Sequence, residues 1–297
     1  MPAYNAEATI LAAVRSTLRA MPQDSELFVG DDASTDRTIE VLQTVRDHRL
    51  RIVADDVNRG SGYVRKRLLA ESDSEYVAAM DADDIAFPWR FTAQMRAFAR
   101  ADVVFGSVVC FGGADSDRIR DYAPGWIRPS LPLGLLPEEF TAALLIHSPA
   151  WHSTLLARRE ALERAGGYRP LRYGQDYEQN LRVAASGARA IRIGLPVVAY
   201  RKSRQQATRK ADYLLTIRNT VELGDSYCRL FNATVRAASL DPHCGDPDHL
   251  AGQIDAGLRE LLAKFRPIPR LYYARLLSSG RPQSWLADQF RWLGSPD

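Results

Sequence analysis

Three carboxylates lie within four positions in the stretch MDADDIAFP. Asp81, Asp83 and Asp84 come directly after the apolar run EYVAAM, which ends at Met80. Like charges this close repel one another, so a binding partner or solvent must offset the repulsion. Hard divalent cations such as Mg²⁺ and Mn²⁺ prefer carboxylate and water ligands. The stretch therefore indicates a divalent metal site, a solvated acidic loop, or a helix start at which Asp84 caps the helix beginning near Pro88.

A second pair of acids follows another short apolar run, ELFVG. Asp31 and Asp32 stand at the end of this run. A carboxylate can accept the N3–H of uracil or the N1–H of guanine. The alternative in this stretch is helix capping, because Ser34 or Asp36 suits the start of the helix that follows. Different residues can do each job, so both interpretations stay open.

These acids need strands and helices to position them, and the first half of the chain alternates between the two. Strands are expected at residues 26–30, 50–56, 75–80 and 102–111, and helices at residues 36–48, 62–72 and 88–101. This alternation predicts a mostly parallel sheet covered on both faces. Ligands of such sheets bind beyond the carboxyl ends of the strands, and both acidic clusters fall at such ends.

The second half of the chain is less regular. Residues 112–137 are rich in Gly and Pro and are expected to be irregular. The stretch WHSTLLARREALERAGGYRP indicates a strand, a short helix and a Gly-Gly turn, and GQDYEQNLRVAASG indicates a helix that stops at Gly187. One or two strands are expected in ARAIRIGLPVVAYRK. After about Gln205 the pattern becomes helical.

Composition restricts the function classes. The chain has 297 residues and a formal net charge of +3, which does not indicate a nucleic-acid partner. Cys110, Cys228 and Cys244 are few and widely spaced, which suits a reducing compartment and matches no zinc spacing. No run of about twenty apolar residues is present to span a membrane, and no leader precedes the first run. We expect a cytoplasmic protein whose basic amphipathic stretches could touch the inner face of the membrane peripherally.

Four stretches together resemble the family 2 glycosyltransferases of the GT-A fold. They are MPAYNAEATI, FVGDDASTDRT, AAMDADDIAFP and GYRPLRYGQDYEQNLRVAASG. The resemblance implies the fold class α/β, as a Rossmann-like GT-A α/β/α sandwich with a mostly parallel central sheet and a helical C-terminal appendage. It implies a nucleotide-sugar-binding half at residues 1–110, an acceptor-side half at 111–204 and a helical C-terminal region at 205–297.

The resemblance also implies roles for the first two acidic clusters. Asp81 and Asp83 match the family's Asp-x-Asp element, in which Asp83 would ligate Mg²⁺ or Mn²⁺ and Asp81 would lie nearer the ribose and the donor sugar. Asp84 would be a supporting third acid, and Asp32 would bind the base. Contacts to the nucleotide and donor are implied for Pro2, Tyr4, Glu7, Asp31, Asp32, Arg65, Asp81 and Ala82.

Asp176 resembles the family's general base, an acid at the head of a helix that faces the acceptor. An inverting transfer needs a carboxylate to remove a proton from the incoming hydroxyl. By spacing alone, Asp176 and Gln179 could instead form an N-terminal capping box. Residues implied on the acceptor side are His152, Gly167, Tyr168 and Gln175. A lone His is more often structural, and a glycine such as Gly166 is more often a helix C-cap.

The implied reaction is the inverting transfer of a sugar from a nucleoside-diphosphate sugar, with a UDP-sugar as first choice, to a hydroxyl acceptor. The acceptor would be a glycan or a lipid-linked glycan in surface polysaccharide synthesis. Two other classes stay open. A magnesium-dependent phosphatase or phosphotransferase would place an Asp nucleophile directly after its first strand. A catalytically inactive sugar-nucleotide-binding protein would need only the donor site.

This sequence departs from the family pattern at several places, including Lys66 and Leu68, where Asn and Gly are commoner. A family loop that closes over the diphosphate often has a His shortly after YR, whereas this chain has Ser203, flanked by Lys202 and Arg204. The acid that commonly precedes the base is Gln175 here. In the family an apolar strand leads into PAYN, so we expect the native start to lie upstream of Met1.

Overall fold

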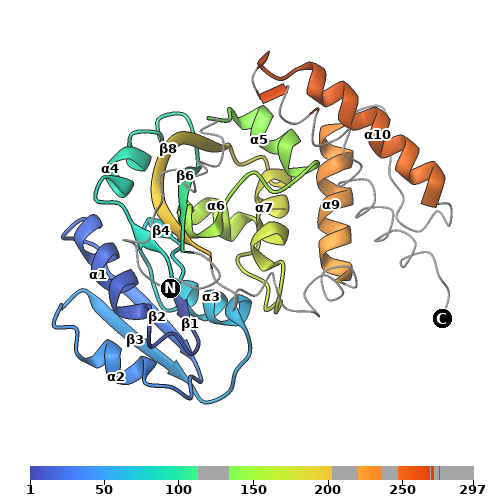
Figure 1. Ribbon diagram of the computed structural model, residues 1–297. Helices are drawn as coiled ribbons and strands as arrows, with labels where there is room; N and C mark the ends of the chain where they lie inside the picture. Colours follow the sequence, from blue (N-terminus) through green and yellow to red (C-terminus); the bar gives the residue numbers. More distant parts are fainter. Residues whose placement is uncertain (113–133, 203–219, 236–246, 268, 271–273, 275–297) are drawn as a thin grey trace, which may run out of the picture.

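The computed structural model describes residues 1–112, 134–202, 220–235, 247–267, 269, 270 and 274 (Figure 1). The elements in chain order are β1 Pro2–Ala3, α1 Ile10–Ala20, β2 Leu27–Asp32, α2 Thr38–Gln43, β3 Leu50–Asp55, α3 Ser61–Ala70, β4 Tyr76–Ala78, β5 Ile85–Ala86, α4 Arg90–Met95, β6 Val103–Phe111, α5 Pro137–Leu144, the 3₁₀ helix η3 His152–Thr154, β7 Leu156–Arg158, α6 Arg159–Arg164, α7 Gln175–Ala185, β8 Ala190–Arg201, α9 Val221–Thr234 and α10 Pro247–Ala263.

The first sheet is parallel and has the strand order β1-β2-β3. Ala3 pairs with Asp31, and Asp32 pairs with Asp55, so the carboxyl ends of all three strands lie at one rim. Helix α3 packs closely on this sheet, because a Cβ atom at Gly30 would lie only 2.4 Å from Cγ1 of Val64. The prediction of a parallel sheet with acids at its rim is confirmed for Asp31 and Asp32, whereas the strand that precedes Asp81, Asp83 and Asp84 belongs to the second sheet, so the two acidic clusters do not lie on one sheet.

The second sheet is mixed and has the order β4-β7-β6-β8-β5. Strands β6 and β8 pair in parallel, whereas β7 is antiparallel to both of its neighbours and β5 is antiparallel to β8. The mostly parallel arrangement is thus confirmed for the first sheet and does not extend to the second. Apolar periodicity predicts a strand but contains no information on its direction, which depends on the strand that lies beside it.

The two sheets are not joined by strand pairing among the residues that the structure describes. A cavity of about 680 Å³ lies between them, and its lining includes Leu27 and Phe28 of β2 and Tyr76 and Val77 of β4. The single central sheet that the sequence predicts is therefore divided in two in this part of the chain.

Apolar side chains cover both faces of the second sheet. Val103 and Phe105 of β6 belong to a core with α5, α7, α9 and α10, whereas Val104 and Val108 belong to a core with α1 and α4. Successive strand residues point to opposite faces, so one strand contributes to both cores. This layering confirms the predicted α/β/α sandwich.

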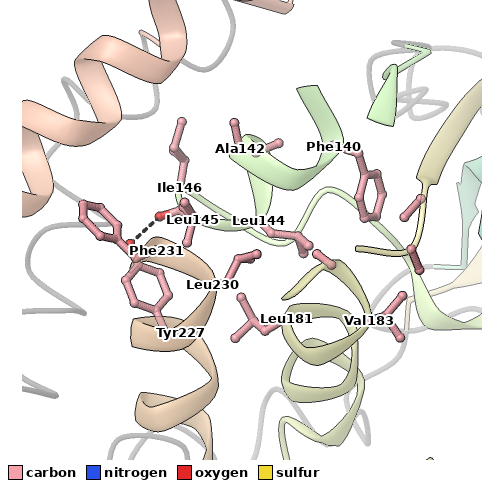
Figure 2. Close-up of a cluster of buried hydrophobic side chains, with 14 of the residues drawn as sticks. Phe140, Ala142, Leu144, Leu145, Ile146, Leu181, Val183, Tyr227, Leu230 and Phe231 are labelled. Atoms are coloured by element: carbon pink, nitrogen blue, oxygen red, sulfur yellow. Dashed lines mark hydrogen bonds between the residues drawn. The ribbon is translucent and has the colours of Figure 1, made fainter. Parts of the chain in front are cut away.

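The described part of the C-terminal region is helical, as predicted, and it is part of the core. Figure 1 shows α9 beside α7, with α10 outside it. Figure 2 shows Leu230 and Phe231 of α9 among side chains of α5 and α7, including Leu144 and Leu181. The hydroxyl of Tyr227 donates to the carbonyl oxygen of Leu145 over 2.8 Å. Within the described residues, no helix is both long and apolar enough to cross a bilayer.

Candidate active site

The loop that carries Asp81, Asp83 and Asp84 joins β4 to β5 and is fastened to the end of β8. Asp84 is fully buried, and its Oδ1 accepts a hydrogen bond from the backbone amide of Arg201 over 2.8 Å. The Nε of Arg201 donates to the carbonyl oxygen of Asp83 over 2.9 Å. Helix α4 begins at Arg90 without a side-chain cap, so the prediction that Asp84 caps this helix is wrong. Asp84 instead fixes the loop to β8.

Positive charge offsets this cluster only in part. Arg65 of α3 forms an ion pair with Asp81, with 2.5 Å between Nη2 and Oδ1. Burial, and then repulsion from Asp81, raises the pKa of Asp83 to about 6. Burial also raises the pKa of Asp84 well above its usual range, and its Oδ2 has no hydrogen-bond partner among the residues described. A divalent cation would relieve this excess of negative charge, so the residues fit one.

The protein does not supply a complete set of metal ligands in the part of the chain that the structure describes. No group of three or more His, Cys, Asp and Glu side chains there could hold an ion. A cation at Asp83 would therefore need further oxygen ligands from water or from a bound phosphate, which is common for Mg²⁺.

Arg65 lies between the acidic loop and the acceptor side. Its side chain is buried, and its Nε and Nη1 have no hydrogen-bond partner within the described ranges. Its positive charge lowers the pKa of His152, after burial as the larger cause, and it opposes the burial that raises the pKa of Asp176. Arg65 thus lies close to both residues, which come from distant parts of the sequence.

Asp31 and Asp32 hold the rim of the first sheet. The carboxylate of Asp31 accepts hydrogen bonds from the backbone amide of Ser34 over 2.9 Å and from its hydroxyl over 2.5 Å. The two oxygens of Asp32 accept the backbone amides of Arg59 and Gly60, each over 2.8 Å. Both carboxylates are nearly inaccessible to solvent, so contact between Asp32 and a base stays a prediction.

The capping alternative for this loop is not realised at the N-cap position. Helix α2 has Arg37 as its N-cap, without a side-chain cap. Ser34 contacts Asp31. Asp36 precedes the N-cap, and its carboxylate accepts the backbone amide of Thr38, the first residue of α2, over 2.9 Å.

The first loop of the chain is fastened to this same segment. Oδ1 of Asn5 accepts the amide of Thr35 over 2.8 Å, and the carboxylate of Glu7 accepts the amide of Arg37 over 3.1 Å. Tyr4 is 48% exposed beside these contacts. Pro2 belongs to β1 at the same rim. The structure thus places Pro2, Tyr4 and Glu7 beside the segment that follows Asp32, and Glu7 makes structural contacts there.

Asp176 is the second residue of α7, after Gly174 with φ +71° and Gln175. Its Oδ1 accepts the amide of Tyr177 over 2.8 Å. The helix has no side-chain cap, so the predicted capping box with Gln179 does not form. The side chain of Gln175 donates to the hydroxyl of Ser61 over 2.9 Å and ties the head of α7 to α3.

The acidic loop and the head of α7 face a common region near the end of β8. Burial raises the pKa of Tyr200, and negative charge from the loop acids and from Asp176 adds to this effect. Helix α3 links the two, because Gln175 donates to Ser61 and Arg65, one turn later, pairs with Asp81. Burial is also the largest cause of the raised pKa of Asp176.

The remaining acceptor-side residues lie in the 3₁₀ helix η3 and in the segment after α6. Nε2 of His152 and the hydroxyl of Tyr168 share a hydrogen bond of 2.8 Å, and both side chains are buried. Gly166 and Gly167 have positive φ angles of +83° and +64° at the end of α6. The C-cap interpretation of Gly166 is confirmed, because its amide donates to the carbonyl oxygen of Glu163 over 2.8 Å.

Sequence reasoning missed several buried charges around this site. Arg90 is fully buried and donates to the carbonyl oxygen of Ala79 over 2.6 Å, which fixes the end of β4. The sequence also does not single out Arg201, which directly precedes Lys202 and holds the acidic loop. Glu178 and Arg182 form a buried ion pair on α7. Ser203 and Arg204 lie outside the described residues.

The family model described as "Glycosyl transferase family 2" matches residues 1–166. The succinoglycan biosynthesis protein ExoU of Rhizobium meliloti is 32% identical over 197 residues, which cover 63% of this chain and 56% of that protein. The chain thus spans a little over half the length of the first curated relatives that it matches.

Two solved structures share the fold. S. aureus TarS 1-349 in complex with UDP-GlcNAc aligns with a TM-score of 0.60 and 17% identity, over 98% of this chain and 88% of that chain. The mannosyltransferase PcManGT from Pyrobaculum calidifontis, in complex with GDP-Man and Mn²⁺, aligns with a TM-score of 0.52 and 20% identity, over 97% of this chain and 84% of that chain. With the GT-A fold shared with these structures and a family model that covers more than half of its length, the chain belongs to glycosyl transferase family 2.

Proposed function

We propose that this chain is an inverting glycosyltransferase that moves a sugar from a nucleoside-diphosphate sugar to a hydroxyl acceptor. One observation carries the proposal: helix α3 contacts both the head of α7, where Gln175 beside Asp176 donates to Ser61, and the acidic loop, where Arg65 pairs with Asp81. An inverting transfer needs a base on the acceptor side and a site for the departing diphosphate opposite it.

The donor is a UDP-sugar. A carboxylate at Asp32 can accept the ring N–H of uracil, and guanine is the other base with a matching N–H group. Both bases occur in the solved structures, because TarS is in complex with UDP-GlcNAc and PcManGT is in complex with GDP-Man. The TarS structure has the higher TM-score, which supports uracil. Exposed Tyr4 would pack against the base at the rim of the first sheet.

A divalent cation, Mg²⁺ or Mn²⁺, belongs to this site. Asp83 would ligate it, and Asp81 would face the ribose and donor sugar while paired with Arg65. When bound, such a cation offsets the charge that develops on the departing diphosphate. The Mn²⁺ of PcManGT and the excess of negative charge in the loop both support this assignment.

Asp176 acts as the general base. Its Oδ1 accepts the amide of Tyr177, which leaves Oδ2 to take the proton of the acceptor hydroxyl. The hydroxyl oxygen bonds to the anomeric carbon as the bond from that carbon to the diphosphate oxygen breaks. Burial makes the carboxylate a stronger base than it is in water, because burial disfavours its charged form.

The other function classes have less support. In a phosphatase the acid after the first strand must be free to attack phosphorus, whereas both Asp31 and Asp32 accept backbone amides here. An inactive binder would not need Asp176. The relative ExoU is named for succinoglycan biosynthesis, which supports a role in surface polysaccharide synthesis with a glycan or lipid-linked acceptor. This role would place the protein at the cytoplasmic face of the membrane.

Thermal unfolding tests the donor site. Wild type and Asp83→Ala are heated with Mn²⁺ and, in turn, UDP, GDP, dTDP, CMP and ADP. A ligand at about 100 times its dissociation constant adds about 2.7 kcal/mol to the free energy of unfolding. We expect stabilisation by UDP that requires Mn²⁺ and is lost in Asp83→Ala. If no nucleotide stabilises the wild-type protein, the proposed donor site is wrong.

A further inference from the structure

The strongest unexplained feature near the site is a buried ion-pair network on α7. Glu178 is fully buried, and its carboxylate receives Nε of Arg182 over 2.7 Å and Nη2 over 2.8 Å. Arg182 is also buried. Burying charges costs free energy, and replacing such a pair by apolar side chains is often neutral or stabilising. Stability alone therefore does not explain this pair.

The network holds residues 165–169 against α7. Arg182 donates from Nη1 to the carbonyl oxygen of Ala165, and from Nη2 to that of Gly167 over 2.8 Å. Arg169 lies 3.1 Å from the carboxylate of Glu178. The guanidinium of Arg182 thus holds the backbone on both sides of Gly166, before Tyr168, and the carboxylate of Glu178 holds Arg169, after Tyr168.

The fastened chain, residues 165–174, fills the space between α7 and the first turn of α3. A Cβ atom at Gly62 would lie 2.4 Å from the carbonyl oxygen of Leu171 and 2.7 Å from that of Arg169. The pKa of the Tyr168 hydroxyl is raised by burial and is influenced by the charges of Arg65, Asp81 and Asp176, so this segment borders the site.

Helix α9 completes the network from behind. The hydroxyl of Ser226 donates to Oε1 of Glu178 over 2.9 Å, and Ser226 is buried. Glu178 therefore receives hydrogen bonds or ion pairs from its own helix, from segment 165–174 and from the C-terminal region. Asp176 lies two residues before it, in the same helical turn.

We propose that Glu178 and Arg182 are positioning residues that set the place of segment 165–174 relative to Asp176, and that Ser226 links this function to α9. The proposal rests on the proposed function, in which Asp176 takes a proton from an acceptor hydroxyl. A displacement of about 1 Å at an acceptor wall can lower the rate about 100-fold. The proposed donor residues lie outside segment 165–174, so binding of the donor nucleotide should not change.

The test compares Arg182→Lys with a matched control, Arg49→Lys. Arg49 is also buried, forms a two-point pair with Asp47 and donates to the carbonyl oxygen of Leu18 over 2.9 Å. It lies at the opposite end of β2, because its carbonyl oxygen accepts the amide of Leu27. Lysine keeps the charge in both variants but cannot form the planar, forked contacts of arginine.

Three quantities are measured on full-length protein. They are UDP release from UDP-GlcNAc with a panel of octyl glycosides as acceptors, thermal stabilisation by UDP with Mn²⁺, and hydrogen exchange of the amides in segment 165–174. In Arg182→Lys we expect faster exchange in this segment, unchanged stabilisation by UDP, and a roughly 10- to 100-fold lower kcat for transfer. In Arg49→Lys only the melting temperature should fall. Ser226→Ala should give a smaller change of the same kind, and it serves if Arg182→Lys does not fold.

The outcomes separate the two proposals. If wild-type protein releases no UDP with any acceptor, the proposed function fails, and the positioning role fails with it. If wild type is active but Arg182→Lys and Ser226→Ala keep the kcat and acceptor KM of Arg49→Lys, the positioning role alone is overturned.

Discussion

Single carboxylates at the site differ in what offsets their charge. Asp81 has an ion pair with Arg65, and Asp84 accepts a backbone amide. Asp83 has burial and the charge of Asp81 against it, so its pKa rises from 3.8 to about 6. The charges of Asp83 and Asp84 are thus both compensated only in part by the protein. The raised pKa of Asp83 makes this residue sensitive to pH and to substitution.

Asp83→Asn should stabilise the metal-free protein at neutral pH. The folded protein favours the neutral form of Asp83, because the pKa of this carboxyl is raised on folding. Below about pH 4 the carboxyl is neutral in both the folded and the unfolded protein and has no cost. As the pH rises from about 4 to about 6, its ionisation destabilises the fold increasingly. The full effect is at most about 3 kcal/mol. Thermal unfolding in EDTA should show a larger gain for Asp83→Asn at about pH 7.5 than at about pH 4.5. An equal gain at both pH values would contradict the assigned pKa.

Asp176→Asn should lower the rate of transfer about 100- to 10,000-fold, because asparagine cannot accept the proton of the acceptor hydroxyl. The amide side chain keeps the size of Asp176, so stabilisation by UDP with Mn²⁺ should not change. The measurement is UDP release at saturating donor. The control is Asp102→Asn, which should keep its activity. Asp102 pairs with Arg189 and lies directly before the first residue of β6. Normal transfer by Asp176→Asn would exclude this residue as the base.

At the scale of elements, the predicted donor half and the predicted acceptor half meet where α3 touches segment 165–174. The hydroxyl of Ser61 accepts a hydrogen bond from the side chain of Gln175. Gly62, which has no side chain, leaves room for the backbone carbonyl oxygens of Arg169 and Leu171. Arg65 follows one turn later on the same helix and reaches Asp81. Helix α3 thus positions parts of both halves, and a change in its first turn should affect both.

Gly62→Ala should destabilise the protein by about 1–3 kcal/mol, because the added methyl group would overlap two backbone oxygens that cannot rotate away. Gly252→Ala in α10 is the matched control. Its Cβ would have no neighbour within 4 Å, and alanine favours a helix interior by up to about 1 kcal/mol. Denaturant unfolding of the two variants should give changes of opposite sign. A neutral Gly62→Ala would show that segment 165–174 can move away from α3.

For the whole molecule, the two cores share the second sheet. Neighbouring residues of β7 also divide between them, since Leu156 belongs to one core and Ala157 to the other. Loss of either core exposes one face of the same sheet. The described halves should therefore unfold together, although the two sheets are not paired by hydrogen bonds.

Phe231→Ala in α9 should lower the free energy of unfolding by about 3–5 kcal/mol, because Phe231 is fully buried. Phe98→Ala, in the other core, should have a similar effect. Calorimetry should give one transition for each variant, at a lower temperature than for wild type. Two separate transitions would show that the cores fold independently.

The sequence by itself determined the local parts of this protein. The alternation of strands and helices from about residue 26 to residue 111, the parallel pairing of β2 and β3, and the glycine end of α6 all follow from periodicity and short-range chemistry. The candidate donor residues could be named because their types and spacing limit the chemistry that they can do.

Only the tertiary structure decided which distant residues meet. Strand direction in the second sheet, the clamp of Arg201 on the acidic loop and the link from Ser226 to Glu178 join positions far apart in the chain. A buried arginine or serine has no periodic signal of its own, because its role depends on the carbonyl or carboxylate that the fold brings beside it. The alternatives in which Asp84 and Asp176 cap helices are not realised for the same reason: backbone contacts and helix starts set by packing took precedence over local spacing.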